Sequence, residues 1–270
     1  MVTRYIHKAI IRLATVVLAV LTAGCELIPE ADRLIAVSLP VEDNGRSHVL
    51  IEFTGFRCVN CPTAAEEAET LRAAYGDRLI VVAMHPASNP FTQGKYDYTC
   101  EEADIYYNYL GGLATTPFPT GNIDFLPNGN SYLSDFSDWP TLLAAEMNKP
   151  PNVSLSVQAV HEAGQLTVRT TYAAQAEQVC RLALWLVQDS VQGAQALPDG
   201  SVSTAYIHRH MLRSAIGDPW GDPLMAQPVP AEQQTSLPYT LEDNKHNYSI
   251  VAVLLDENKQ IINARQTPVQ

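Results

Sequence analysis

A hydrophobic segment that leads directly into a pair of cysteines limits the possible folds of this chain more than any other feature. Residues 48–53 are largely apolar around Glu52, and Cys58-Val59-Asn60-Cys61-Pro62 follows one short turn later. Proline suits the first turn of a helix, because the N–H that it lacks has no partner there. The pattern therefore predicts a buried strand, a sharp turn that carries both cysteines, and the start of a helix.

The next segments complete a β-α-β unit. Apolar residues recur at helical spacing from Thr63 to Tyr75, and Gly76 is suited to ending that helix. The continuous apolar run from Leu79 to Met84 is typical of a strand buried on both faces, so the two strands should be parallel. We also expect a first strand at 34–40, helices at 100–110 and 139–148, and short strands at 122–126 and 131–133.

The periodicity changes after Pro150-Pro151. Short segments suited to strands follow, separated by turns and without a helical pattern, at 153–157, 166–170, 182–187, 206–212, 250–255 and 261–265. Several short strands at this spacing predict a β-sandwich. We therefore place a domain boundary near Pro150, with one domain over residues 34–149 and a second over 150–270.

The first residues have the composition of a bacterial export signal. Arg4, Lys8 and Arg12 precede a short apolar stretch at 13–20, which is shorter than the roughly 20 residues that span a bilayer. Leu21-Thr22-Ala23-Gly24-Cys25 then resembles the lipobox of lipoproteins. The resemblance implies that residues 1–24 are removed, that Cys25 carries lipid, and that 25–33 form a tether. An ordinary signal peptide with Cys25 nearby is the alternative.

Charge and composition narrow the class of partner. The net charge of −12 argues against nucleic acid, because binding phosphates requires a basic surface. We expect the lipid on Cys25 to provide membrane attachment and an envelope or surface protein to be the partner. No cofactor and no metal site are expected, since His208 and His210 form a pair without a third ligand at a recognisable spacing.

Two cysteines separated by two residues at a helix start are close enough to form a disulfide. The helix N-terminus favours a thiolate, and a thiolate attacks disulfides, so Cys58 and Cys61 can exchange electrons with a substrate. Beyond Cys25 the chain also holds Cys100 and Cys180, and four cysteines allow three pairings. The adjacent pair is the natural one; Cys100 and Cys180 are either free buried thiols or a bridge between the two halves.

The residues around the cysteine pair resemble the thioredoxin superfamily. Glu52 stands where that family has a buried acid on the strand, and Phe118-Pro119-Thr120 resembles its cis-proline segment. The resemblance implies that Glu52 assists proton transfer at the resolving thiol and that Pro119 faces the disulfide. Arg57 replaces the usual tryptophan, and the proline between the cysteines is missing, so we expect the reduction potential of the pair to differ from that of the family.

The chain also resembles the outer-membrane-protein-28-related family of Gram-negative lipoproteins. The resemblance rests on Glu52-Phe53-Thr54-Gly55 with the cysteine pair, on Phe118-Pro119-Thr120-Gly121, and on residues 206–213 with the Trp220-Gly221 turn. It implies outer-membrane localisation and an α/β thioredoxin-like domain followed by an all-β immunoglobulin-like sandwich domain. It does not supply an activity.

Two functions are consistent with these features. The first is thiol–disulfide exchange in the cell envelope, in which Cys58 attacks because it lies nearer the exposed helix start, Cys61 resolves the mixed disulfide, Glu52 moves protons and Pro119 shapes the substrate groove. The second is a non-enzymatic outer-membrane or surface binding lipoprotein, an adhesin or the subunit of a complex, in which the disulfide is structural.

Overall fold

The computed structural model describes residues 45–96, 98–241 and 247–270. The predicted signal peptide, the lipidated Cys25, the tether and the strand expected at 34–40 lie outside the described residues. Within those described ranges, no helix combines the length and the hydrophobicity needed to cross a membrane.

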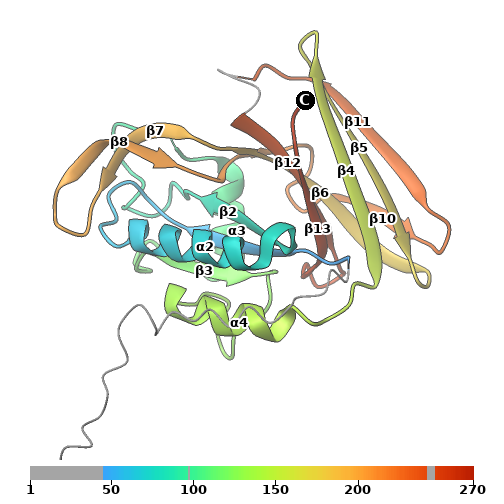
Figure 1. Ribbon diagram of the computed structural model, residues 1–270, viewed down its shortest axis with the longest axis horizontal. Coiled ribbons are helices and arrows are strands. Elements are labelled where there is room, and N and C mark those ends of the chain that lie inside the picture. The colour runs from blue at the N-terminus through green and yellow to red at the C-terminus, as the bar shows by residue number, and fades with distance from the viewer. Residues whose placement is uncertain (1–44, 97, 242–246) are drawn as a thin grey trace, which may run out of the picture. The chain divides into compact units, whose positions relative to one another are not determined.

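The β-α-β unit forms around the cysteine pair as its sequence predicts. Strand β1 (His48–Phe53) is followed by helix α2 (Cys61–Tyr75), the 3-10 turn η2 (Gly76–Arg78) and strand β2 (Leu79–Met84) (Figure 1). The two strands pair in parallel, with Glu52 opposite Ala83. Proline lies in the first turn of α2, and Gly76 ends the helix with a positive φ of 57°.

Helix α3 (Glu101–Tyr109) and strand β3 (Thr120–Ile123) follow, and β3 pairs antiparallel with β1. The strand expected at 122–126 ends early because Asp124 and Phe125 have positive φ angles of 55° and 54°. The strand expected at 131–133 does not form: the segment makes isolated bridges, and Asn122 donates to the carbonyl of Tyr132. The short turn η3 (Phe136–Asp138) and helix α4 (Trp139–Glu146) complete this half.

The second half is β-structure throughout its described residues. A three-stranded sheet joins β4 (Val153–Glu162), β5 (Gln165–Ala174) and β11 (Ala231–Pro238), and a separate hairpin joins β7 (Val191–Ala196) and β8 (Val202–His208). The strand expected at 206–212 is divided into β8 and β9 (Met211–Ala215), because His210 between them has a φ of 54°. The remaining strands are β6 (Gln178–Gln188), β10 (Asp222–Ala226), β12 (Tyr248–Leu255) and β13 (Ile261–Pro268).

One eight-stranded sheet contains strands from both halves, in the order β13-β12-β6-β9-β2-β1-β3 with β10 beside β6. The residues of strand β12 show that the two faces of this sheet belong to different hydrophobic cores. Val251, Val253 and Leu255 join the core that includes β1, β2 and α3, whereas Ile250, Ala252 and Leu254 pack with β4 and β5. A third core lies under α2 and α4. The molecule is therefore mostly β with several sheets, and the boundary near Pro150 stays a prediction.

Candidate functional site

The two predicted cysteines form a disulfide, with 5.4 Å between the Cα atoms of Cys58 and Cys61. Cys61 is the first residue of α2, and Cys58 lies in the turn between β1 and the helix. Both residues are buried, with exposures of 1% for Cys58 and 2% for Cys61. The exposure that we expected at Cys58 is therefore not observed, because two other segments of the chain cover the turn.

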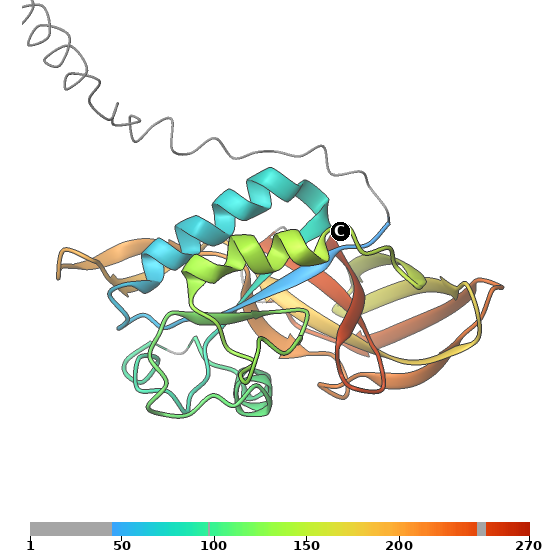
Figure 2. The same cartoon turned by 90° about the horizontal axis from the view of Figure 1, so that it is seen from below.

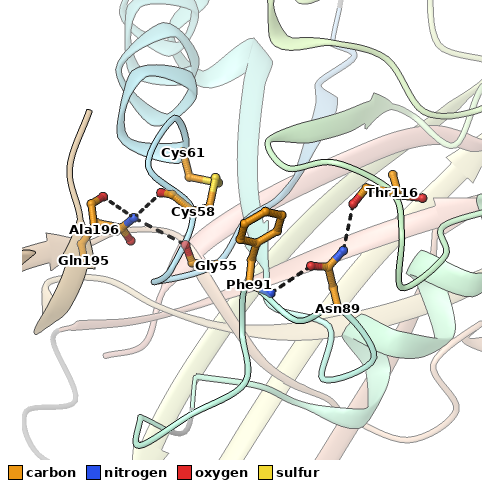
Figure 3. The surroundings of a disulfide bond; sticks show 8 residues. All are labelled: Gly55, Cys58, Cys61, Asn89, Phe91, Thr116, Gln195 and Ala196. Atoms are coloured by element: carbon orange, nitrogen blue, oxygen red, sulfur yellow. Dashed lines mark hydrogen bonds between the residues drawn. A yellow bond between two sulfur atoms is a disulfide. The ribbon is translucent and has the colours of Figure 1, made fainter. Parts of the chain in front are cut away.

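The first cover is the loop that follows β2. The backbone N–H of Arg57 donates to the carbonyl of Phe91 at 3.0 Å, and the Phe91 ring lies beside the disulfide (Figure 3). A Cβ at Gly55 would meet the Phe91 carbonyl oxygen at 2.6 Å, so the close approach requires glycine. The Phe91 ring stacks on Phe118, and the Phe118–Pro119 peptide is cis, as the resemblance implied.

The second cover is the β7–β8 hairpin. Nε2 of Gln195 donates to the carbonyl oxygens of Cys58 at 2.8 Å and Ala196 at 3.0 Å, and lies 3.4 Å from that of Gly55 (Figure 3). The N–H of Ala196 donates to the carbonyl of Phe56 at 2.8 Å. Figure 2 shows the hairpin beside the N-terminal end of α2. A buried amide from the second half of the chain thus fixes the cysteine turn.

Aromatic side chains hold the hairpin on this surface. Tyr98 packs against His208 with ring centroids 4.7 Å apart and against Phe56 at 6.0 Å. A Cβ at Gly193 in β7 would meet the Tyr98 hydroxyl at 1.6 Å, so a larger residue there would have to displace the tyrosine side chain. The hairpin is therefore packed onto the site and is not a free extension.

We expect Gln195→Ala to expose Cys58. Among the bonds that the variant removes, the one to the Cys58 carbonyl joins the hairpin to the cysteine turn. Its loss costs roughly 1–1.5 kcal/mol, so opening of the hairpin should become about tenfold more frequent. The measurement is the rate at which a bulky maleimide alkylates Cys58 in a Cys61→Ser background. Gln192→Ala, an exposed position on the same strand, is the matched control and should leave the rate unchanged. Equal rates in both variants would show that Gln195 does not hold the turn closed.

Glu52 lies at the other side of the disulfide, where a cavity of about 470 Å³ is lined by both Glu52 and Cys61. The residue is 3% exposed, and its Oε1 has no hydrogen-bond partner among the described residues. Burial raises the pKa of Glu52 to about 7, opposed by the positive charge of His210 and a hydrogen bond from Thr54. At neutral pH this carboxyl is therefore close to half protonated, as proton transfer in both directions requires.

His210 carries a positive charge at the rim of the same cavity. Its Nε2 donates to Oε1 of Glu69 at 2.6 Å, and its Nδ1 lies 3.4 Å from Oδ2 of Asp189. Burial acts to lower the pKa of His210, but the contacts with Asp189 and Glu69 outweigh it and raise the pKa to about 9. The hydrogen bond with His210 lowers the pKa of Glu69 to about 2.

The remaining candidates have less reactive surroundings. Cys100 and Cys180 are free, so no bridge joins them, and burial raises their pKa to about 12 and about 11. His85 is 2% exposed and lines the cavity, and burial lowers its pKa to about 3. Within the described ranges, no cluster of three or more His, Cys, Asp or Glu side chains is suited to a metal ion.

Residues 103–270 match the family model for the outer membrane protein Omp28, which is more than half of the chain. The chain therefore belongs to this family of outer-membrane proteins, and the resemblance inferred from its sequence is confirmed. The cysteine pair itself precedes the matched region. No curated protein sequence matches the chain significantly.

Two solved structures of low sequence identity share the fold, and a third resembles this chain over a shorter stretch. HBP35 of Porphyromonas gingivalis is 16% identical, with a TM-score of 0.67 over 83% of this chain and 76% of that chain. A protein from Agrobacterium tumefaciens is 14% identical, with a TM-score of 0.53 over 83% of this chain and 94% of that chain. A domain of the outer membrane lipoprotein Omp28 from Porphyromonas gingivalis is 13% identical, with a TM-score of 0.34 over 44% of this chain and 89% of that chain.

Proposed function

We propose that the protein carries out thiol–disulfide exchange at Cys58 and Cys61 in the cell envelope. The pair alternates between a disulfide and a dithiol, and Glu52 accepts or supplies the proton at Cys61. Cys58 is 1% exposed beneath Gln195, which removes the reason for choosing it as the attacking thiol. Phe118, the neighbour of Pro119, stacks on the Phe91 ring beside the disulfide, which supports the part assigned to Pro119 in shaping this surface.

The observation that carries the proposal is the buried carboxyl of Glu52 on the strand before the cysteines, whose Oε1 has no partner among the described residues. A polar atom that is buried without a partner costs roughly 1–3 kcal/mol, and a stable core would be better served by an apolar side chain. A purely structural disulfide has no use for such a group. An exchanging disulfide does, because each thiol must gain or lose a proton as the pair is reduced or oxidised.

The test is the reduction potential of the Cys58–Cys61 couple in the mature protein. Dithiol–disulfide buffers set the potential, and alkylation with a mass tag counts the reduced thiols. We expect one two-electron transition between about −270 and −120 mV, the range of exchanging couples. Cys58→Ser/Cys61→Ser is the control, in which Cys100 and Cys180 should show no transition.

The second candidate is a surface or outer-membrane binding lipoprotein in which the disulfide only stabilises the turn. The burial of both sulfur-bearing residues favours this function. The same titration separates the two, because structural disulfides have potentials below about −300 mV. A value in that range would sink the exchange proposal and leave the binding function.

We also propose a finer description of architecture and placement. The parallel β1-α2-β2 unit and the cysteine pair at the start of α2 support a thioredoxin-like first domain over residues 34–149. The two packed layers formed by β4, β5 and β11 against β6 and β12 support an immunoglobulin-like sandwich over residues 150–270. Family membership supports placement at the outer membrane, and the lipobox-like residues 21–25 support a lipid on Cys25 as the anchor.

A further inference from the structure

The cavity behind the disulfide is built from both halves of the chain. Helix α2 forms one wall through Ala65, Glu66 and Glu69, and β8 with the turn to β9 forms the other. Glu52, Cys61 and His85 lie in its lining, and all three are buried. Of the two bonded cysteines, Cys61 is the one that this cavity reaches.

Unpaired polar atoms point to a ligand in this cavity. Oε1 of Glu52 and both ring nitrogens of His85 have no hydrogen-bond partner among the described residues, although these residues are 3% and 2% exposed. Each unsatisfied buried atom costs roughly 1–3 kcal/mol. A small polar molecule that enters the cavity would supply the missing donors and acceptors, which apolar ligands would not.

The lining carries charges of both signs. Glu66 lies on the helix wall and Arg209 on the strand wall, and no ion pair joins them within the described part of the chain. The positive His210 is already paired with Glu69. A ligand with one ammonium group and one carboxylate would match Glu66 and Arg209, while an ion of a single sign would face a like charge.

Protein substrates have no comparable route to the sulfurs. The turn that bears Cys58 lies beneath the Phe91 loop and the Gln195 amide, so a folded partner would have to displace one of them. A cavity of about 470 Å³ admits a small molecule without that displacement. Resting on the exchange function above, we propose that the substrate is a low-molecular-weight thiol with an amine and a carboxylate, which attacks Sγ of Cys61 from this cavity.

The reaction balances as two exchanges. The thiol gives its proton to Glu52, its sulfur bonds to Sγ of Cys61, and the Cys58–Cys61 bond breaks with its electron pair on Cys58, which takes up a proton. A second molecule of the same thiol attacks the mixed disulfide and releases Cys61 as a thiol. In sum, two small thiols become one small disulfide, and the protein disulfide becomes two thiols. The reverse sequence oxidises the protein.

A variant that fills the cavity tests the route. Ala65 lines the cavity one helical turn after Cys61, so Ala65→Trp should slow reduction of the disulfide by cysteine and by glutathione at least tenfold. Ala73→Trp, on an exposed position of the same helix, should stay within twofold of the wild type. Rates are measured by acid quenching and mass-tag alkylation, and circular dichroism checks that both variants are folded.

Single-cysteine variants give a second measurement that does not depend on Ala65. Free Cys61 in Cys58→Ser should form a mixed disulfide with cystine or oxidised glutathione at least ten times faster than free Cys58 in Cys61→Ser. Equal rates, or a preference for Cys58, would overturn the assignment of the cavity as the route.

Reduction rates with small thiols and with a protein dithiol distinguish the small-thiol route through the cavity from the exchange function itself. If a reduced protein dithiol such as thioredoxin reduces the wild type and Ala65→Trp equally fast, while small thiols do not, the small-thiol route is wrong and exchange stands. If neither small thiols nor the protein dithiol reduces the folded chain, both are wrong.

Discussion

Asp124→Ala should lower the free energy of unfolding by about 3–5 kcal/mol, the usual cost of removing one partner from a buried ionic cluster. Asp124 is fully buried at the end of β3. Its Oδ2 lies 2.6 Å from Nδ1 of His48 and 3.3 Å from the Arg46 guanidinium, and its Oδ1 accepts from the N–H of Val49 at 2.7 Å. Without the carboxylate, Nδ1 of His48 and the N–H of Val49 would lose the acceptor of these bonds, and Arg46 would lose its ion-pair partner.

Two matched variants locate the cause of that loss. Asp222→Ala removes an exposed aspartate in β10 and should change the stability by no more than about 0.5 kcal/mol. Asp124→Asn keeps a side chain that tolerates the positive φ and one carbonyl acceptor, so its cost should lie between the other two. Urea unfolding followed by tryptophan fluorescence measures all three. A loss below 1 kcal/mol in Asp124→Ala would show that the cluster is not a major source of stability.

The helices and strands around the cysteine pair could be predicted because several features of the nearby sequence favour the same structure. The apolar run at β2, the proline at the start of α2 and Gly76 at its end each favour the same structure. Two of the strand errors fall where single residues take positive φ angles, at Asp124 and at His210. A strand pattern in the sequence continues through both positions, and side-chain contacts from distant segments decide where the strand stops.

The disulfide of the cysteine turn was predictable, but the surroundings of the turn were not. Gln195 bonds to the carbonyl of Cys58 across 137 residues, and His210 pairs with Glu69 across 141. Neither residue has a sequence spacing that ties it to the cysteines. The His208 and His210 pattern was recognisable, and we expected no metal site there, but the pattern did not indicate what the two residues do. His210 is an ion-pair partner at the cavity and His208 packs on Tyr98.

Glu52→Gln should slow thiol–disulfide exchange at pH 7 by about a hundredfold. At high pH the variant should also be more stable than the wild type. The loss of rate follows from removal of the proton carrier at Cys61, since a positioned acid–base group contributes roughly 10²–10⁴ to a rate. The measurement is the rate of reduction by cysteine from pH 5 to pH 9. The wild-type profile should contain a titration near the Glu52 pKa of about 7, and the variant profile should not.

The raised pKa of Glu52 determines whether stability rises or falls with pH. Below pH 4.5, the ordinary pKa of a glutamate, Glu52 is protonated in both the folded and the unfolded chain, and it adds no pH dependence. Between pH 4.5 and about 7 the unfolded chain ionises and the folded chain does not, so wild-type stability falls. The total fall is about 3 kcal/mol. Glutamine does not titrate, so the variant should gain about 3 kcal/mol on the wild type between pH 4 and pH 8.

The matched control is Glu257→Gln, which changes an exposed glutamate in the turn between β12 and β13. It should change neither the rate nor the pH dependence of stability.

The two effects of Glu52→Gln belong together, because a group that destabilises the fold and accelerates exchange is retained for its chemistry. A variant with wild-type rates and higher stability would instead show that Glu52 is a buried charge without a part in exchange. A variant with lower rates and no gain in stability would show that the carboxyl is not held in its neutral form by burial.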